Sequence, residues 1–393
     1  MLNQNFVFMT YAQKKHFFVE FCKRLIKKKI KRMSMSLRNK AIKSAVAFLL
    51  LITISLRAES FSENVENILS DASNRPFNGT LLIFRGQDVL FENSTGAYGA
   101  PASSSQFVIG SISKHFTSFA LLRLVDDGKL SLEDPIEQFI PAMNGADYSA
   151  ILVRHLLDHT SGLKALYGSP ANMPGSHFEY SPTVGYFLAS RIIESVTGEK
   201  YAEYLNSLLS SRGLKDTLLA DARDISTLQR ANSRLATGFC EYNGNFSVAS
   251  QLDEGIDLEG GEWSHPGGGV ISTAKDLMQW LTALHDTQDL LSQANYQGMI
   301  TPSAAREGHR YGSIGYGLGV QVSNEDDLFE VSHSGYINGY TSTLLYYPKE
   351  KVGVVILENV SWDLSDLKRV FAPHDDIRAA VRYRMKTKRK PFD

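Results

Sequence analysis

The sequence has very little cysteine, since only Cys22 and Cys240 occur among its 393 residues. This excludes the disulfide framework that holds many small secreted domains together. If the segment before residue 59 is removed, Cys240 remains as a single thiol, which we interpret as a small packing side chain. Cysteine usage is therefore compatible with an oxidising or a reducing compartment.

Motifs of metal and phosphate sites are absent as well. The sequence contains no H-E-x-x-H, no C-x-x-C and no glycine-rich loop of the kind that holds phosphates. We therefore expect neither a metal nor an organic cofactor. The G-x-S-x-G elbow is also missing, which disfavours the α/β-hydrolase route to a serine nucleophile.

Acidic residues are nearly absent from the first 58 positions, which carry 13 Lys and Arg but only one acid, Glu20. The remaining residues carry 28 basic and 41 acidic side chains, a net charge of −13. Such an acidic body would repel phosphates, so we exclude nucleic acid as a partner.

No apolar run is long enough to be a standard membrane span. The apolar run Ala45–Leu56 carries no charge but has only 12 residues, too few to cross ~30 Å of hydrocarbon. Basic residues precede this run and Ala58 follows it, which predicts a signal peptide over residues 33–58. Met33 and Met35 lie just before it, so we interpret residues 1–32 as a non-native or disordered extension. Retention as an uncleaved anchor is the alternative.

The predicted domain, residues 59–393, has strands near both ends and helices between them. Sheet segments distant in sequence must then meet in one sheet, with a mostly helical lobe inserted. We interpret the basic segment 376–390 as a solvated final helix. The predicted strands are 79–85, 88–92, 329–333, 341–347 and 352–358, and the predicted helices are 61–70, 111–127, 151–157, 184–196 and 201–209.

Ser111-Ile112-Ser113-Lys114 is an S-x-x-K quartet at the start of the predicted buried helix 111–127. Residues three apart share a helical face, so the amine of Lys114 can reach the hydroxyl of Ser111. A helix N-terminus favours negative charge on that oxygen, and a desolvated lysine can act as a base. An N-terminal capping serine with a surface lysine is the alternative, but a charge in so apolar a helix argues against it.

Several motifs in consistent order resemble the class C β-lactamase and penicillin-binding-protein superfamily of serine hydrolases. They cover roughly residues 75–360 and include the segments FVIGSISKHFTS from Phe107, VRHLLDHTSGL from Val153, GGGVISTAKDL from Gly267, YGLGV from Tyr316 and His333-Ser334-Gly335. The resemblance implies a β-lactamase/transpeptidase-like α+β fold, in which an antiparallel sheet with flanking helices carries the helical lobe. It also implies Ser111 as nucleophile and Lys114 as base.

Tyr180 matches the family's catalytic tyrosine, which the resemblance implies shares proton transfer with the lysine. The asparagine that normally follows two residues later is replaced by Pro182. We expect Ser181 and Pro182 to begin the next helix, and Thr183 to offer the substrate a hydroxyl. A half-buried loop tyrosine without a role is the alternative.

His333-Ser334-Gly335 lies where β-lactamases usually have Lys-Thr-Gly, and we expect it on a sheet edge facing the nucleophile. The resemblance implies that His333 is one of the catalytic residues and that Ser334 and Gly335 bind substrate. It also implies that the backbone amides of Ser111 and Tyr336 form the oxyanion hole. Histidine gives up a permanent positive charge, so recognition of a substrate carboxylate should weaken. We expect structural roles for His155 and His159.

These observations predict an exported, periplasmic or secreted serine hydrolase that acts on a small-molecule or peptide substrate. Its acyl-enzyme would form on an ester, an amide or a D-amino-acid peptide more readily than on a β-lactam. We expect no stable membrane insertion after signal cleavage. A binding or sensor protein for peptidoglycan peptides on the same scaffold, and a membrane-tethered structural protein, are the alternatives.

Overall fold

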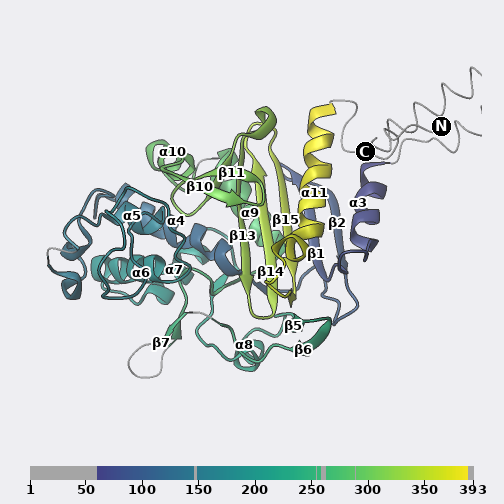
Figure 1. The fold of residues 1–393 in the computed structure, drawn as a ribbon, viewed down its shortest axis with the longest axis horizontal. Helices are drawn as coiled ribbons and strands as arrows, with labels where there is room; N and C mark the ends of the chain where they lie inside the picture. The colour runs from purple at the N-terminus through teal and green to yellow at the C-terminus, as the bar shows by residue number, and fades with distance from the viewer. Residues whose placement is uncertain (1–59, 146–147, 254, 258–262, 288, 388–393) are drawn as a thin grey trace, which may run out of the picture. The chain divides into compact units, whose positions relative to one another are not determined.

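An antiparallel sheet runs through the centre of the fold (Figure 1). The computed structural model describes residues 60–145, 148–253, 255–257, 263–287 and 289–387, so the predicted extension and signal peptide lie outside the described residues. The sheet contains eight of the described strands in the order β10-β11-β12-β13-β14-β15-β1-β2. They are β1 (Gly79–Arg85), β2 (Asp88–Thr95), β10 (Ala304–His309), β11 (Gly312–Tyr316), β12 (Gln321–Ser323), β13 (Glu330–Ile337), β14 (Tyr340–Tyr347) and β15 (Val352–Glu358).

Strands from the two ends of the chain pair with each other, as predicted. β1 runs antiparallel to β15, with Gly79 opposite Glu358 and Arg85 opposite Val352. β1 also forms the predicted hairpin with β2, which extends three residues beyond the predicted end. The fold class expected from the sequence is therefore confirmed.

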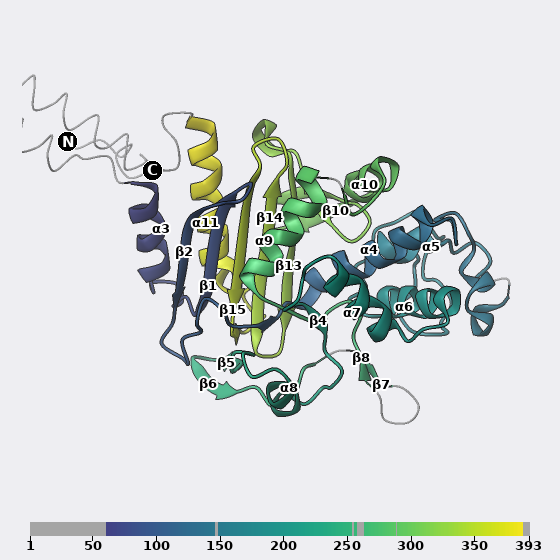
Figure 2. The same ribbon diagram turned by 180° about the vertical axis from the view of Figure 1, so that it is seen from behind.

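The two faces of the sheet pack against different helices (Figures 1 and 2). Alternate residues of β15 show the division, because side chains alternate across a strand. Val352, Val354 and Ile356 pack with α3 (Phe61–Ser70) and α11 (Leu367–Thr387). Val355 and Leu357 join the larger core that contains α4 (Ser113–Asp126) and α9 (Ala274–Thr282).

The helical lobe lies between β2 and β10 in sequence. It includes α5 (Val153–Leu157), α6 (Val184–Thr197) and α7 (Tyr201–Ser211), close to their predicted positions. Two further helices are α8 (Ile225–Ala231) and α10 (Gln293–Ile300). No helix among the described residues combines the length and the apolarity that a membrane crossing requires.

Several short strands were not predicted from the sequence, and most of them lie within residues 205–323. Besides β10–β12, short strands form three small sheets. β3 (Phe107–Val108) and β4 (Leu218–Leu219) flank β9 (Val270–Ser272), β5 (Phe239–Tyr242) lies between β6 (Asn245–Val248) and β16 (Val360–Ser361), and β7 (Ile256–Asp257) pairs with β8 (Trp263–Ser264). The first of these sheets holds the segment before Ser111.

The prediction of a solvated final helix is wrong. The last helix, α11, begins at Leu367 and packs its apolar side on the sheet with Ile377 and Val381. Its buried cations are paired, because Arg378 and Arg382 both contact the buried carboxylate of Glu330 on β13. Two of the segment's basic residues, Arg378 and Arg382, are therefore held in buried ion pairs rather than exposed.

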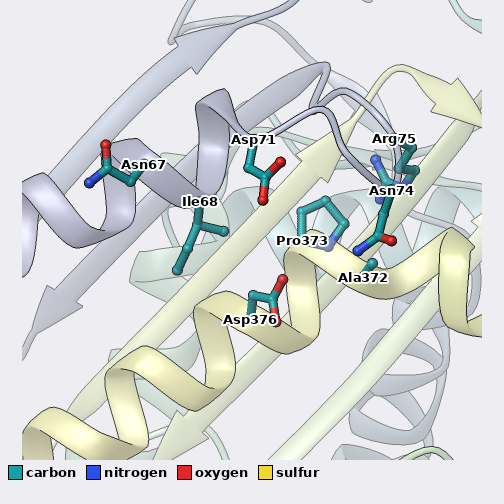
Figure 3. Close-up of a pocket in the computed structure, with 8 residues that line it drawn as sticks. All are labelled: Asn67, Ile68, Asp71, Asn74, Arg75, Ala372, Pro373 and Asp376. Atoms are coloured by element: carbon teal, nitrogen blue, oxygen red, sulfur yellow. The ribbon is translucent and has the colours of Figure 1, made fainter. Parts of the chain in front are cut away.

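A small pocket of about 180 Å³ lies between α3 and α11 (Figure 3). Asp71 and Asp376 face it, whereas the guanidinium of Arg75 is occupied by a two-point salt bridge to Glu358. Burial first, and then the nearby Asp375 and Asp71, raise the pKa of Asp376. Its lining contains no serine, cysteine or lysine, so this pocket is not a candidate for acyl transfer.

Candidate active site

Ser111 sits in a tight turn between β3 and α4. The sequence predicted an α-helix from Ser111, but residues Gly110–Ile112 form a 3₁₀ turn and α4 begins at Ser113. Gly110 has a φ of +54°, a left-handed conformation that favours glycine. The hydroxyl of Ser113 donates to the carbonyl of Gly110 and accepts from the amide of Val270, which ties this turn to β9.

Lys114 is fully buried directly below Ser111. Its Nζ donates to Ser111 Oγ at 3.0 Å and to the carbonyl oxygen of Gly267 at 2.8 Å. The same Nζ lies 5.2 Å from the ring centroids of Tyr180 and Tyr186. Within the described part of the chain, Lys114 has no carboxylate partner, so a hydroxyl, a carbonyl and two aromatic faces provide its polar environment.

Tyr180 completes the contacts of Ser111, because its hydroxyl donates to Ser111 Oγ at 2.7 Å. The prediction that Ser181 and Pro182 begin the following helix is wrong. α6 starts at Val184, and its N-cap, Thr183, makes no side-chain capping hydrogen bond. Pro182 lines the cleft beside Tyr180, whereas Thr183 is not among the lining residues.

A chain of hydrogen bonds connects the Tyr180 loop to β13. The amide of Ser181 donates to His159 Nδ1 at 3.3 Å, and the hydroxyl of Tyr316 lies 3.2 Å from His159 Nε2 and 2.9 Å from His333 Nε2. At the far end, His333 Nδ1 contacts the carbonyl oxygen of Ser334 at 2.8 Å.

The partners at the two ends fix the tautomers of both imidazoles. A carbonyl only accepts, so His333 carries its proton on Nδ1, and an amide only donates, so His159 carries its proton on Nε2. Tyr316 therefore accepts from His159 and donates to His333. Burial is the largest cause that holds the pKa of each histidine well below its usual value, and the charge of Lys114 acts in the same direction. His333 thus supplies no positive charge.

The turn before Ser111 lies against the backbone of β13. A Cβ atom on Gly335 would approach the carbonyl oxygen of Ile109 to 2.0 Å, and one on Gly110 would approach the amide nitrogen of Tyr336 to 2.6 Å. β12 pairs with β13 only as far as Ser332. His333–Ile337 is therefore unpaired on that side, as the predicted sheet edge requires, although β13 is an interior strand of the sheet.

These elements enclose a cleft of about 350 Å³. It brings together most of the residues that the sequence singled out: Ser111, Tyr180, His333, Ser334, Gly335 and Tyr336 line it. Lys114 lies below them, in contact with Ser111. The remaining lining comes from the β10–β11 hairpin, including Arg306 and Arg310, and from Leu364, Leu367 and Phe371.

Sequence reasoning missed several members of this site. Gly267 acts through its backbone carbonyl. Arg306 on β10 and Arg310 in the turn after it belong to a hairpin that was not predicted. Tyr316 was visible as the start of the YGLGV motif, but its position between two histidines requires the three-dimensional structure. His159 contacts loop backbone, in line with its expected structural role.

Comparisons with known proteins agree with this architecture. A family model described as Beta-lactamase matches residues 75–368. Penicillin-binding protein 4* of Bacillus subtilis (strain 168) is 27% identical over 323 residues, which cover 73% of this chain and 69% of that protein. Protein flp of Staphylococcus aureus (strain N315) is 25% identical over 288 residues, 66% of this chain but only 53% of that protein.

Solved structures show the same fold. The D-amino acid amidase from Ochrobactrum anthropi SV3, complexed with D-phenylalanine, superposes with a TM-score of 0.65 at 23% identity, covering 82% of this chain and 98% of the amidase. The family model spans about three quarters of the sequence. It includes all residues that line the Ser111 cleft except Phe371, which follows its last matched position. The chain therefore belongs to the beta-lactamase family and is a serine hydrolase.

Proposed function

We propose that the chain hydrolyses ester or amide bonds, including those of D-amino-acid derivatives, through an acyl-enzyme on Ser111. The observation that carries this proposal is the double contact of Ser111 Oγ with Lys114 Nζ and Tyr180 Oη at the floor of the cleft. A hydroxyl is a weak nucleophile unless neighbouring groups take its proton.

In the proposed first step, Ser111 Oγ attacks the substrate carbonyl while its proton passes to the Lys114 and Tyr180 pair. The amides of Ser111 and Tyr336 would hold the developing oxyanion. The pair then returns the proton to the departing oxygen or nitrogen as its bond to the carbonyl carbon breaks. Water attacks the acyl-enzyme in the second step and regenerates Ser111.

Two features favour esters and amides over β-lactams as substrates. The neutral, buried His333 replaces the lysine of the usual Lys-Thr-Gly motif, so β13 offers no cation to a carboxylate on the substrate. A relative in fold is a D-amino acid amidase. We further propose that residues 33–58 act as a signal peptide and that the hydrolase works in the periplasm or outside the cell; sequencing the mature N-terminus tests this, with a start near Glu59 expected.

The central test uses a fluorophosphonate probe together with p-nitrophenyl esters and D-amino-acid p-nitroanilides. Wild-type protein should be labelled at Ser111 and turn over at least one substrate, whereas Ser111→Ala should lose both properties. Ser70→Ala, an exposed serine on α3, is the matched control and should behave like wild type. Stable ligand binding by intact protein without any covalent adduct, unchanged in Ser111→Ala, would support a binding protein instead.

A further inference from the structure

Arg306 is a cation in the cleft, and no acidic residue in the described part of the chain pairs with it. It lies on β10, is half-buried and lines the same cleft as Ser111. Its guanidinium carbon stacks 4.9 Å from the ring centroid of Tyr180 and 5.9 Å from that of Phe178. Among the described residues, the side chain of Arg306 takes part in these ring contacts but in no hydrogen bond or salt bridge.

The other charged groups of the cleft wall are already engaged. Arg310 donates to Asp375 at 2.7 Å, to the hydroxyl of Tyr311 at 2.6 Å and to Ser334 Oγ at 2.8 Å. Glu307 is the one carboxylate among the lining residues and accepts from the hydroxyl of Ser313. Burial and the neighbouring arginines lower the pKa of His309 to about 3, so it is neutral. Arg306 is therefore the cation that remains for a ligand.

The position of Arg306 indicates which part of a substrate it would meet. Tyr180 stands beside the departing atom in the proposed reaction, because it hydrogen-bonds to the nucleophile and returns the proton. The guanidinium of Arg306 stacks on the ring of Tyr180. A substrate group that it binds would therefore belong to the departing part of the substrate. A guanidinium has five N–H donors in one plane and binds carboxylates with two parallel hydrogen bonds.

We propose that Arg306 binds a carboxylate on the departing part of the substrate and so determines specificity. This inference rests on the proposed function and narrows its substrate class to esters or amides with an anionic leaving portion. The cation that binds this carboxylate would come from the β10–β11 hairpin. The sequence analysis had expected weak carboxylate recognition because β13 carries a histidine in place of a lysine.

Two aryl esters with the same acyl group test the proposal. One phenol carries a meta-carboxylate and the other a meta-carboxamide, and each rate is divided by the rate of hydroxide hydrolysis. Wild type should favour the carboxylate by about tenfold or more in kcat/KM, as expected for a charge-assisted bidentate contact. Arg306→Gln should bring this ratio close to one, and Arg306→Lys should retain part of it.

Arg191→Gln on α6 is the control, since this exposed arginine pairs with Glu194 outside the cleft, and it should keep the wild-type ratio. A wild-type ratio near one, or a ratio that survives Arg306→Gln, would overturn the proposal. If neither ester is cleaved and Ser111 is not labelled, the proposed function itself fails. Calorimetry on Ser111→Ala then tests carboxylate binding by Arg306 separately, by comparing the affinities of 3-hydroxybenzoate and 3-hydroxybenzamide. Tighter binding of the benzoate that is lost on adding Arg306→Gln supports the proposal, and equal binding of the two compounds refutes it.

Discussion

Tyr316 lies between the imidazoles of His159 and His333 and is the only link between them in the hydrogen-bond chain described above. Through Ser181 and Ser334 the same chain reaches the loop of Tyr180 and the strand of the predicted oxyanion hole. Tyr316 touches neither Ser111 nor the bound substrate's reacting atoms in the proposed mechanism. It is therefore a positioning residue.

We expect Tyr316→Phe to lower kcat about 10- to 100-fold, because small displacements of catalytic groups have effects of this size. The change also leaves His159 Nε2 and His333 Nε2 buried without partners, which should lower the free energy of unfolding by about 1–3 kcal/mol. Steady-state kinetics and urea unfolding measure the two effects. Histidine NMR in wild type should show the proton on Nε2 of His159 and on Nδ1 of His333.

Tyr340→Phe provides the matched comparison, because this buried tyrosine donates a single hydrogen bond to the carbonyl of Ala236. It should lose stability without a comparable fall in kcat. Equal kcat values in the two variants would show that Tyr316 contributes only to stability.

At the scale of single residues, the sequence could predict side chains that carry chemistry at fixed spacing. Ser111 and Lys114 are three positions apart in one turn, so local geometry alone brings them together. Gly267 could not be predicted in the same way, because its contribution is a backbone carbonyl placed by a loop 153 residues further on. Arg306 likewise depends on strand pairing rather than on a local pattern.

Helix α11 is the element whose environment the sequence predicted least well. Its basic residues predicted a solvent-exposed helix. The ion pairs to Glu330, however, can form only when the helix lies against β13. Tyr347 also donates to Glu330, at 2.6 Å. The β10–β12 strands were missed for a related reason. They are short, and glycines lie within β10 and β11, so the pairing of each strand with the next, from β10 through β11 and β12 to β13, defines them more than their sequence does.

The cluster at Glu330 predicts how α11 is held. We expect Glu330→Gln to lower the free energy of unfolding by about 3–5 kcal/mol, because it removes the buried anion that Arg378 and Arg382 share and leaves them only exposed acids, Glu325 and Asp326. Urea unfolding at neutral pH measures this loss. Glu133→Gln removes an exposed salt bridge to Arg154 and should change stability by less than about 1 kcal/mol. Similar values for the two variants would contradict a buried anchoring role for Glu330.

Buried histidines with lowered pKa values are spread through the described part of the molecule. Six histidines within the described residues are buried, and burial is the largest cause that lowers the pKa of each: His115, His159, His265, His285, His333 and His374. For His115, His265 and His285 the pKa falls to about 3. Glu358 is a buried carboxylate with a lowered pKa. Its burial raises the pKa, but Arg75 and His374 outweigh the burial and lower the pKa to about 2.

These shifts predict acid lability of the fold. Below about pH 6.5 the unfolded chain binds protons on imidazoles that stay neutral in the fold, so the free energy of unfolding decreases as pH falls. Each such histidine contributes a slope of about 1.4 kcal/mol per pH unit between its unfolded and folded pKa values. Between pH 4.5 and 2 the carboxylate of Glu358 acts in the same direction, since only the unfolded chain protonates it readily.

Urea midpoints measured between pH 7 and pH 4 should therefore fall steeply, and unfolding near pH 5 should be accompanied by uptake of several protons. His285→Gln should reduce that uptake by about one proton, because it removes one buried imidazole. Ser70→Ala, the exposed change on α3, removes no imidazole and should leave the uptake unchanged. A stability that is flat from pH 7 to pH 4 would mean that the buried imidazoles take up protons within the fold, which would contradict the predicted acid lability.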